Sequence, residues 1–172
     1  MLDNYFIETN FPIEEYHDEI VEEFEKLGTF KQYITSNKRG KNVWPYHGKY
    51  MVARLDDVKD AHILKFVEQE FYQMYGIKTK GRYLDLPPNY EITPHFDDGT
   101  LCSFNYIIEG DSPIIFDEDN LTINYKKGLL NISKVHSVPA STSRRKLLKL
   151  SIADHTFEEV KQKIEESSVS SW

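Results

Sequence analysis

The chain has 172 residues and a formal net charge of −7, from 21 Lys and Arg against 28 Asp and Glu. This length suits a single domain (1–172), and the lone cysteine, Cys102, excludes both an internal disulfide and a cysteine-based zinc cluster. The acidic balance argues against a broad electrostatic surface for nucleic acid.

Two amphipathic helices are expected in residues 1–80, which we interpret as a helical support region. In residues 12–27 apolar side chains recur at spacings of three and four, with acidic side chains on the opposite face, and residues 58–75 repeat the pattern. Between the two helices, residues 30–34 and 49–53 are expected to form strands.

From residue 81 onward, short apolar runs alternate with turn residues, which is typical of a sandwich or barrel. The expected strands are 81–86, 91–96, 101–109, 113–116, 121–125, 129–133, 136–138 and 145–153, followed by a helix at 156–166. We therefore predict an α+β, mainly β fold. Its core is a double-stranded β-helix (a cupin-like jelly roll) at 81–154, with the N-terminal helices packed on one sheet and a C-terminal helix and tail in 155–172.

A metal site is predicted from His95, Asp97 and His136. His95 and Asp97 are two residues apart in an extended segment, so both side chains can point to one small volume. His136 stands 39 residues beyond Asp97, near the start of a late strand, and is the best candidate for a third ligand. Two imidazoles and one carboxylate leave coordination positions open, which is the arrangement of Fe(II) sites that react with O2. Asp98 is an alternative ligand if the register differs.

Arg145 begins a strand that otherwise consists largely of apolar residues. Strand alternation lets only one of Arg144 and Arg145 point inward, and we favour Arg145. An inward guanidinium has to be paired, and its planar fork matches a carboxylate. A bound dicarboxylate would therefore satisfy it.

These residues resemble the 2-oxoglutarate- and Fe(II)-dependent oxygenases, particularly small prolyl-4-hydroxylase-like members. The resemblance covers about residues 82–154 and rests, in order, on Arg82-Tyr83, His95-x-Asp97, the strand at 128–132, His136-x-Val138 and the downstream Arg145. It implies that His95, Asp97 and His136 bind iron and that Arg145 binds the far carboxylate of 2-oxoglutarate. It also implies hydroxylation of a substrate with O2, while 2-oxoglutarate is converted to succinate.

The chain departs from this family at the second co-substrate contact. Leu86 occupies the position where the family often has a Tyr, about nine residues before the first ligand His. Tyr83, Tyr90 or Asn105 could supply the missing hydrogen bond, and we expect Tyr83 and Asn105 to contact the co-substrate.

Substrate contacts are expected from Trp44, Tyr46 and Tyr90. Trp44 and Tyr46 belong to an aromatic loop, and binding residues concentrate on loops. An equally good interpretation is that these aromatic side chains anchor a long loop to the core.

The expected substrate is a peptide side chain, an amino acid or a small metabolite rather than nucleic acid. No apolar run approaches the roughly 20 residues that cross a bilayer, and the N-terminus lacks the features of a signal peptide. We therefore expect a cytoplasmic protein without a membrane partner. Small chains of this kind resemble bacteriophage-encoded members, and for a phage-encoded chain the expected compartment is the host cytoplasm. The sequence predicts no oligomeric state. Two alternatives are a cupin-type metalloenzyme that needs no oxoacid and a non-catalytic jelly-roll module of a virion or adaptor.

Overall fold

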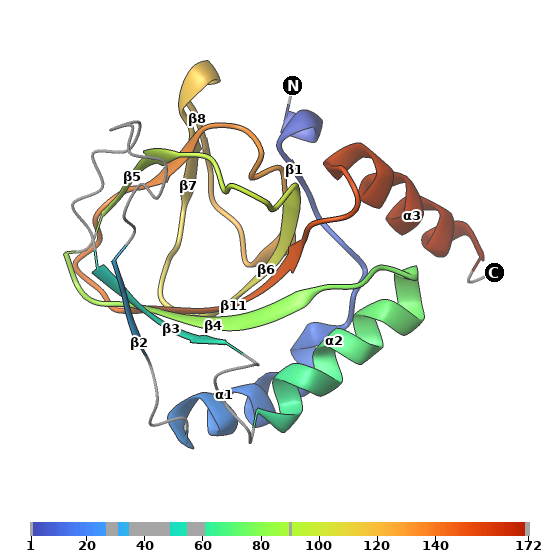
Figure 1. Ribbon diagram of the computed structural model, residues 1–172, viewed down its shortest axis with the longest axis horizontal. Coiled ribbons are helices and arrows are strands. Elements are labelled where there is room, and N and C mark those ends of the chain that lie inside the picture. The colour runs from blue at the N-terminus through green and yellow to red at the C-terminus, as the bar shows by residue number, and fades with distance from the viewer. Residues whose placement is uncertain (1, 27–30, 35–48, 55–60, 90, 171–172) are drawn as a thin grey trace.

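The computed structural model describes residues 2–26, 31–34, 49–54, 61–89 and 91–170, which Figure 1 colours along the chain. Most of the described residues belong to two antiparallel sheets and to helices. The helices are η1 (Leu2–Asn4), η2 (Ile13–Tyr16), α1 (His17–Lys26), α2 (His62–Tyr75), η4 (Asp117–Asp119) and α3 (Phe157–Ser170). Within these ranges, no helix has both the length and the apolar composition needed to cross a membrane.

The larger sheet has seven strands in the order β1-β9-β6-β11-β4-β3-β2, and the smaller has four in the order β5-β10-β7-β8. The strands of the larger sheet are β1 (Phe6–Ile7), β2 (Lys31–Ile34), β3 (Lys49–Arg54), β4 (Lys80–Leu86), β6 (Cys102–Glu109), β9 (Lys127–Leu130) and β11 (Arg145–Ile152). Those of the smaller sheet are β5 (Ile92–His95), β7 (Ile114–Phe116), β8 (Leu121–Ile123) and β10 (His136–Val138). The predicted mainly β jelly-roll fold with N- and C-terminal helices is confirmed.

Strand β1 has no counterpart in the sequence prediction. It contains only Phe6 and Ile7, which pair with Leu130 and Leu129 of β9 at the edge of the large sheet. Two residues are too few to produce an alternation of apolar and polar side chains. Pairing with β9, rather than a local sequence pattern, therefore makes this segment a strand.

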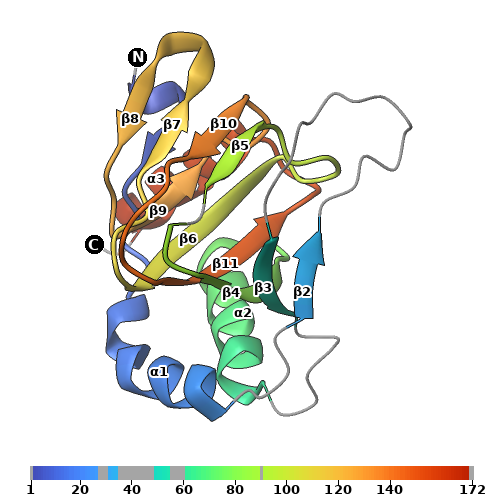
Figure 2. The same cartoon turned by 90° about the vertical axis from the view of Figure 1, so that its left-hand side faces the viewer.

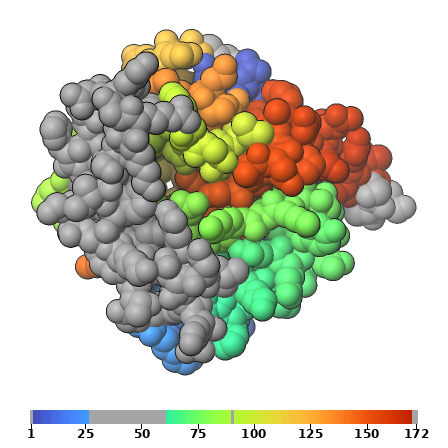
Figure 3. Space-filling model, viewed as in Figure 1, coloured from blue at the N-terminus to red at the C-terminus, as the bar shows by residue number. Residues whose placement is uncertain are grey.

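The helices cover one face of the large sheet, and the small sheet faces the other (Figures 1 and 2). Apolar residues of α1, α2 and α3 pack together with those of β4, β6 and β11 in the largest cluster of the core. Figure 3 shows α2 and α3 side by side at the surface. Two smaller clusters contain residues from both sheets and fill part of the space between them.

Strand β11 shows how alternation separates these two environments. Leu148 and Leu150 pack among the helices, whereas Leu147 packs in a cluster between the sheets. Successive strand residues point to opposite faces, so Arg145 and Lys149 share the inward face with Leu147. Two basic side chains therefore enter the space that the two sheets enclose.

Glu23 joins α1 to the start of α2. Its carboxylate accepts hydrogen bonds from the N–H groups of Ile63 (2.8 Å) and Leu64 (2.9 Å) and from the hydroxyl of Tyr83 (2.5 Å). The first N–H groups of a helix have no partner within the helix, and negative charge near them is favourable. A buried carboxylate from another helix thus caps α2.

Glu23→Ala is expected to lower the free energy of unfolding by about 3 kcal/mol, because it leaves buried N–H and O–H groups without their charged acceptor. Urea denaturation followed by circular dichroism measures the change. Glu22→Ala is the matched control on the same helix: Glu22 is exposed, and its ion pair with Lys26 lies at the surface, so no measurable loss of stability is expected. Equal losses in the two variants would contradict the capping role.

Glu68 of α2 accepts a hydrogen bond from the N–H of Gly81 at 2.7 Å, where β4 passes close to the helix. Burial raises the pKa of this carboxyl above its ordinary value of 4.5, and this outweighs the opposing effects of the Gly81 N–H and of Lys65 and Lys80. A raised pKa means that the protonated form is favoured in the folded chain. Its contribution to stability is therefore complete below pH 4.5 and is lost as the pH rises through the folded pKa.

Glu68→Gln is accordingly expected to raise the free energy of unfolding at pH 7 by up to about 1 kcal/mol, since the amide is neutral and its oxygen can still accept from Gly81. The advantage should disappear near pH 4, where the parent carboxyl is protonated. Unfolding midpoints of both proteins at the two pH values test this. An advantage that is the same at pH 4 and pH 7 would rule out the titration of Glu68 as its cause.

Candidate metal centre

Three predicted ligands lie together at one end of the small sheet. His95 is the last residue of β5, His136 is the first residue of β10, and the two are register partners in antiparallel pairing. Their ring centroids are 4.4 Å apart. Asp97 lies two residues beyond the end of β5, and its backbone N–H donates to the carbonyl of Ile132 at 3.2 Å. One potential ligand atom from each of His95, Asp97 and His136 lies within 4.8 Å of the other two.

Hydrogen bonds to the backbone fix which ring nitrogen of each histidine faces the site. His95 Nδ1 lies 2.8 Å from the carbonyl of Thr93, and His136 Nδ1 lies 2.7 Å from the carbonyl of Lys134. A carbonyl can only accept, so each Nδ1 carries the hydrogen and, in a neutral ring, each Nε2 keeps a lone pair. Metal-binding histidines are usually oriented by this kind of hydrogen bond.

Both Nε2 atoms point at the same carboxylate oxygen. Asp97 Oδ1 lies 3.2 Å from Nε2 of His95 and 3.4 Å from Nε2 of His136. Lone pairs of neutral rings would repel a carboxylate oxygen at these distances, whereas a cation coordinated by all three atoms makes the same arrangement favourable. The residues present therefore fit a divalent metal.

Asp97 is ionised in this environment. Burial acts to raise the pKa of its carboxyl, but the charge of the Lys149 ammonium, the largest of the opposing effects, helps to hold the pKa well below the usual range. Lys149 Nζ donates to Asp97 Oδ2 at 2.6 Å. A carboxylate has to be deprotonated to bind a metal, so Asp97 is ready to do so at neutral pH.

The donor set is nitrogen and oxygen only. Two imidazoles and a carboxylate suit Fe(II) and other first-row divalent ions, whereas thiolates suit structural zinc. Among the described residues, these three form the group with the geometry of a metal site. Cys102 lies apart from it: its thiol is buried, its Sγ donates to the carbonyl of His155, and burial raises its pKa to about 12.

Arg145 and Arg144 point in different directions, as strand alternation predicts. Arg145 is fully buried (0% exposed), and its Nη1 donates to the carbonyl of Pro139 at 2.8 Å. The side chain of Arg144 is 50% exposed and forms a two-pronged ion pair with Asp85. The inward guanidinium thus belongs to Arg145. Its binding to a co-substrate stays a prediction.

Asn105 lies on the inward face of β6, opposite Lys149 in register. Its Nδ2 donates to the hydroxyl of Tyr125 at 3.1 Å, and its Oδ1 accepts from Ser103 at 3.0 Å. Burial raises the pKa of Tyr125 to about 12, so its phenol is neutral and keeps its proton. A short polar chain of Ser103, Asn105 and Tyr125 therefore lies next to Lys149.

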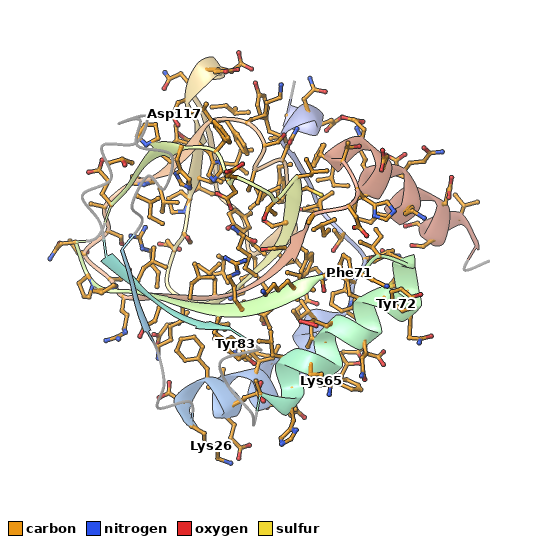
Figure 4. All side chains as sticks on the ribbon, in the orientation of Figure 1. Lys26, Lys65, Phe71, Tyr72, Tyr83 and Asp117 are labelled. Carbon is orange, nitrogen blue, oxygen red and sulfur yellow. The ribbon has the colours of Figure 1, made fainter. Side chains whose placement is uncertain are left out.

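Tyr83 is not part of this site, which corrects the sequence prediction. Its hydroxyl donates to Glu23, and its ring packs against Phe24 at a centroid distance of 5.5 Å. Figure 4 shows Tyr83 between β4 and the helices. In a strand, neighbouring residues point to opposite faces, and Leu84 takes the inward face in the cluster between the sheets. The predicted contacts Trp44, Tyr46 and Tyr90 lie outside the described residues.

The sequence prediction did not identify Lys149 or Tyr125 as site residues. Lys149 interrupts an apolar strand four residues after Arg145, so alternation puts both on one face. That spacing was a usable signal. Tyr125 lies between β8 and β9, and nothing in its sequence context distinguishes it from a core aromatic residue.

Comparison with known proteins identifies similar folds but no similar sequences. No known protein family and no characterised protein matches the sequence. A prolyl-4-hydroxylase from Pseudomonas putida has a similar structure, with a TM-score of 0.59 and 12% identity over 88% of this chain and 93% of that one. An oxidoreductase of the 2OG-Fe(II) oxygenase family from Burkholderia pseudomallei matches with a TM-score of 0.55 and 11% identity, over 81% of this chain and 79% of that one.

Likeness at this level of identity shows the fold and does not by itself assign an activity. The chain thus has the fold of 2-oxoglutarate oxygenases and, within it, a candidate metal site of two histidines and one aspartate.

Proposed function

We propose that the chain is an Fe(II)- and 2-oxoglutarate-dependent dioxygenase that hydroxylates a peptide side chain, an amino acid or another small metabolite. In this reaction one oxygen atom of O2 enters succinate, the other enters the new hydroxyl group, and CO2 leaves. The observation that carries the proposal is the convergence of His95 Nε2, His136 Nε2 and Asp97 Oδ1 on one small volume. Such a trio leaves coordination positions for a bidentate co-substrate and O2.

The protein's own contribution at the metal is orientation. Each histidine donates its Nδ1–H to a carbonyl two residues earlier, so the rings of His95 and His136 cannot turn without losing a hydrogen bond. Asp97 is held ionised by Lys149. When bound, Fe(II) supplies the one-electron chemistry with O2 that no side chain in the site provides.

Arg145 is proposed to bind the far carboxylate of 2-oxoglutarate. Strand β10 runs from His136 at the metal ligands to Val138, and Arg145 donates to the next carbonyl, that of Pro139. The guanidinium therefore lies beyond the far end of a three-residue strand whose near end holds a ligand. On β11 it stands four residues from Lys149, about 13 Å along the strand. A five-carbon diacid together with an arginine side chain can span that separation.

The surroundings of Arg145 favour this role. Arg145 has two apolar neighbours that belong to one buried cluster. Leu86 is its register partner on β4, and Leu147 is the next residue of β11 on the same face. A carboxylate binds a guanidinium more strongly where water is excluded. Asn105 is the register partner of Lys149 and donates to Tyr125, and we propose these two residues as the second polar contact with the co-substrate. Asn105 then replaces the tyrosine that this chain lacks at Leu86.

The substrate is proposed to approach over Phe96, which lies between two ligand residues and is 40% exposed. The net charge of −7 favours a small or peptidic substrate over a nucleic acid. Trp44, Tyr46 and Tyr90 remain the proposed substrate contacts.

Anaerobic addition of Fe(II) and then 2-oxoglutarate tests the proposal. Chelation of iron by the oxoacid should give a weak charge-transfer band in the visible region that neither component gives alone. Release of succinate is then measured against a panel of peptides, amino acids, small metabolites and oligonucleotides. Iron binding without the band would instead support a metalloenzyme that uses no oxoacid, and no iron binding would support a non-catalytic module.

A further inference from the structure

Lys149 differs from the other lysine near it on β11. Lys146 points to the helical face and lies near two glutamates, Glu25 (2.9 Å) and Glu109 (3.3 Å), whose side chains are exposed. Lys149 points into the space between the sheets, its side chain is only 13% exposed, and it contacts Asp97. The Lys146 side chain is 16% exposed, so the two lysines are buried to a similar degree and differ in their partners: exposed glutamates for Lys146 and a proposed metal ligand for Lys149.

The two oxygens of Asp97 have different partners. Oδ1 faces the Nε2 atoms of His95 and His136, whereas Oδ2 accepts a hydrogen bond from Lys149 Nζ at 2.6 Å. Carboxylates bind metals through one oxygen or through both. In this site only Oδ1 is directed at the volume between the ligands.

We propose that Lys149 is a positioning residue that restricts Asp97 to one-oxygen coordination and thereby keeps one more position open on the metal. This inference rests on the metal site of the proposed function. If the carboxylate turned to bind through both oxygens, Oδ2 would leave Lys149. An ammonium group that loses its partner in a mostly buried place is strongly unfavourable. The contact therefore resists that rotation.

The open position matters for the proposed chemistry. A six-coordinate ion with three protein atoms has three remaining positions, two for a chelating oxoacid and one for O2. If Asp97 used both oxygens, one of the three would be lost. Lys149 would then determine whether the co-substrate and O2 can be bound together.

Stability alone does not account for a lysine at this place. Burial of an ion pair gives little net stabilisation, because the cost of removing both charges from water offsets their attraction. Arg82 of β4 is the register partner of Lys149, and two basic residues opposite each other are unfavourable in a sheet. An apolar residue at this position would make the sheet more stable, so we assign the role of Lys149 to its contact with Asp97.

The number of water molecules on bound Mn(II) tests the proposal. Mn(II) prefers six oxygen or nitrogen ligands, and broadening of its electron paramagnetic resonance lines by 17O-labelled water reports how many waters it carries. About three waters are expected in the parent chain and about two in Lys149→Met, where Asp97 is released to bind through both oxygens. Lys149→Arg, whose guanidinium can still donate to Oδ2, should restore about three.

Lys146→Met is the matched control, with the same change on the same strand but on the other face, and should keep about three waters. Mn(II) affinity should rise in Lys149→Met, because the variant gains a ligand oxygen and loses a like charge beside the ion. A merely structural role would lower the affinity and leave the number of waters as it is.

Circular dichroism establishes that each variant folds, and Lys149→Leu serves if Lys149→Met does not. An unchanged water count in the folded variant would overturn the inference while the proposed function stands. A parent chain that binds no Mn(II) at these three residues would overturn the metal site itself, and with it the proposed function.

Discussion

His136→Ala is expected to bind Fe(II) or Mn(II) at least about 100-fold more weakly than the parent chain. Loss of a residue that only orients a ligand typically costs 10- to 100-fold in affinity, and His136 is proposed as a ligand itself. Its side chain is 5% exposed and its Nε2 lies 3.4 Å from Asp97 Oδ1, so the substitution removes a buried nitrogen that points into the proposed site. Anaerobic competition titration against a metal-responsive dye measures the dissociation constants.

Thermal unfolding gives an independent measurement of the loss of metal affinity in His136→Ala. A metal present at 100 times its dissociation constant stabilises the folded chain by about 2.7 kcal/mol. For a chain of this size that corresponds to roughly 5–10 °C in the unfolding midpoint. The parent should show this shift on addition of metal, and His136→Ala should show almost none.

His155→Ala is the control for histidine removal. His155 pairs with Asp154 near the start of α3, away from the site, and both metal affinity and the metal-induced shift should match those of the parent. Parent-like affinity in the His136→Ala protein would refute the proposed ligand set.

Arg145→Leu is expected to weaken binding of 2-oxoglutarate by about 100-fold while Fe(II) affinity stays near that of the parent. A two-pronged guanidinium–carboxylate contact contains two charge-assisted hydrogen bonds, and a loss of about 3 kcal/mol corresponds to a factor of more than 100. Titration of the visible band of the Fe(II) complex measures the affinity. Arg144→Leu removes the exposed neighbour, paired with Asp85, and should leave that affinity unchanged.

The far carboxylate of the oxoacid provides a readout that a folding defect does not imitate. 2-Oxopentanoate has the same five-carbon chain and keto acid head as 2-oxoglutarate but lacks the far carboxylate. The parent should prefer 2-oxoglutarate strongly, whereas Arg145→Leu should bind the two acids about equally. If the preference survived in the variant, some other residue would bind the far carboxylate.

Much of the fold could be predicted because its signals are local. The period of three to four in residues 12–27 and the alternation within 145–153 depend only on neighbours in sequence, and both segments form the expected elements, α1 with η2 and β11. The inward direction of Arg145 follows from the same alternation. His95, Asp97 and His136 could be proposed as a set because ligand chemistry restricts the residue types.

The contact that positions Asp97 in the site could not be predicted from local sequence patterns. Strand β5 ends at His95, so Asp97 is not held by strand alternation but by the hydrogen bond from its N–H to the carbonyl of Ile132, 35 positions away along the chain. The local spacing of His95 and Asp97 correctly predicted that the two lie close together. The long-range hydrogen bond to Ile132 is what positions Asp97.

Which face of each strand meets the helices was decided only by tertiary packing. Alternation separates Tyr83 from Leu84, but it does not say which of the two faces α1, and the structure turns Tyr83 toward Glu23. The same holds for Lys149, whose partner Asp97 lies 52 residues earlier in the chain. Side-chain direction repeats every two residues and can be read locally, whereas the partner across the interior depends on how the two sheets close over each other.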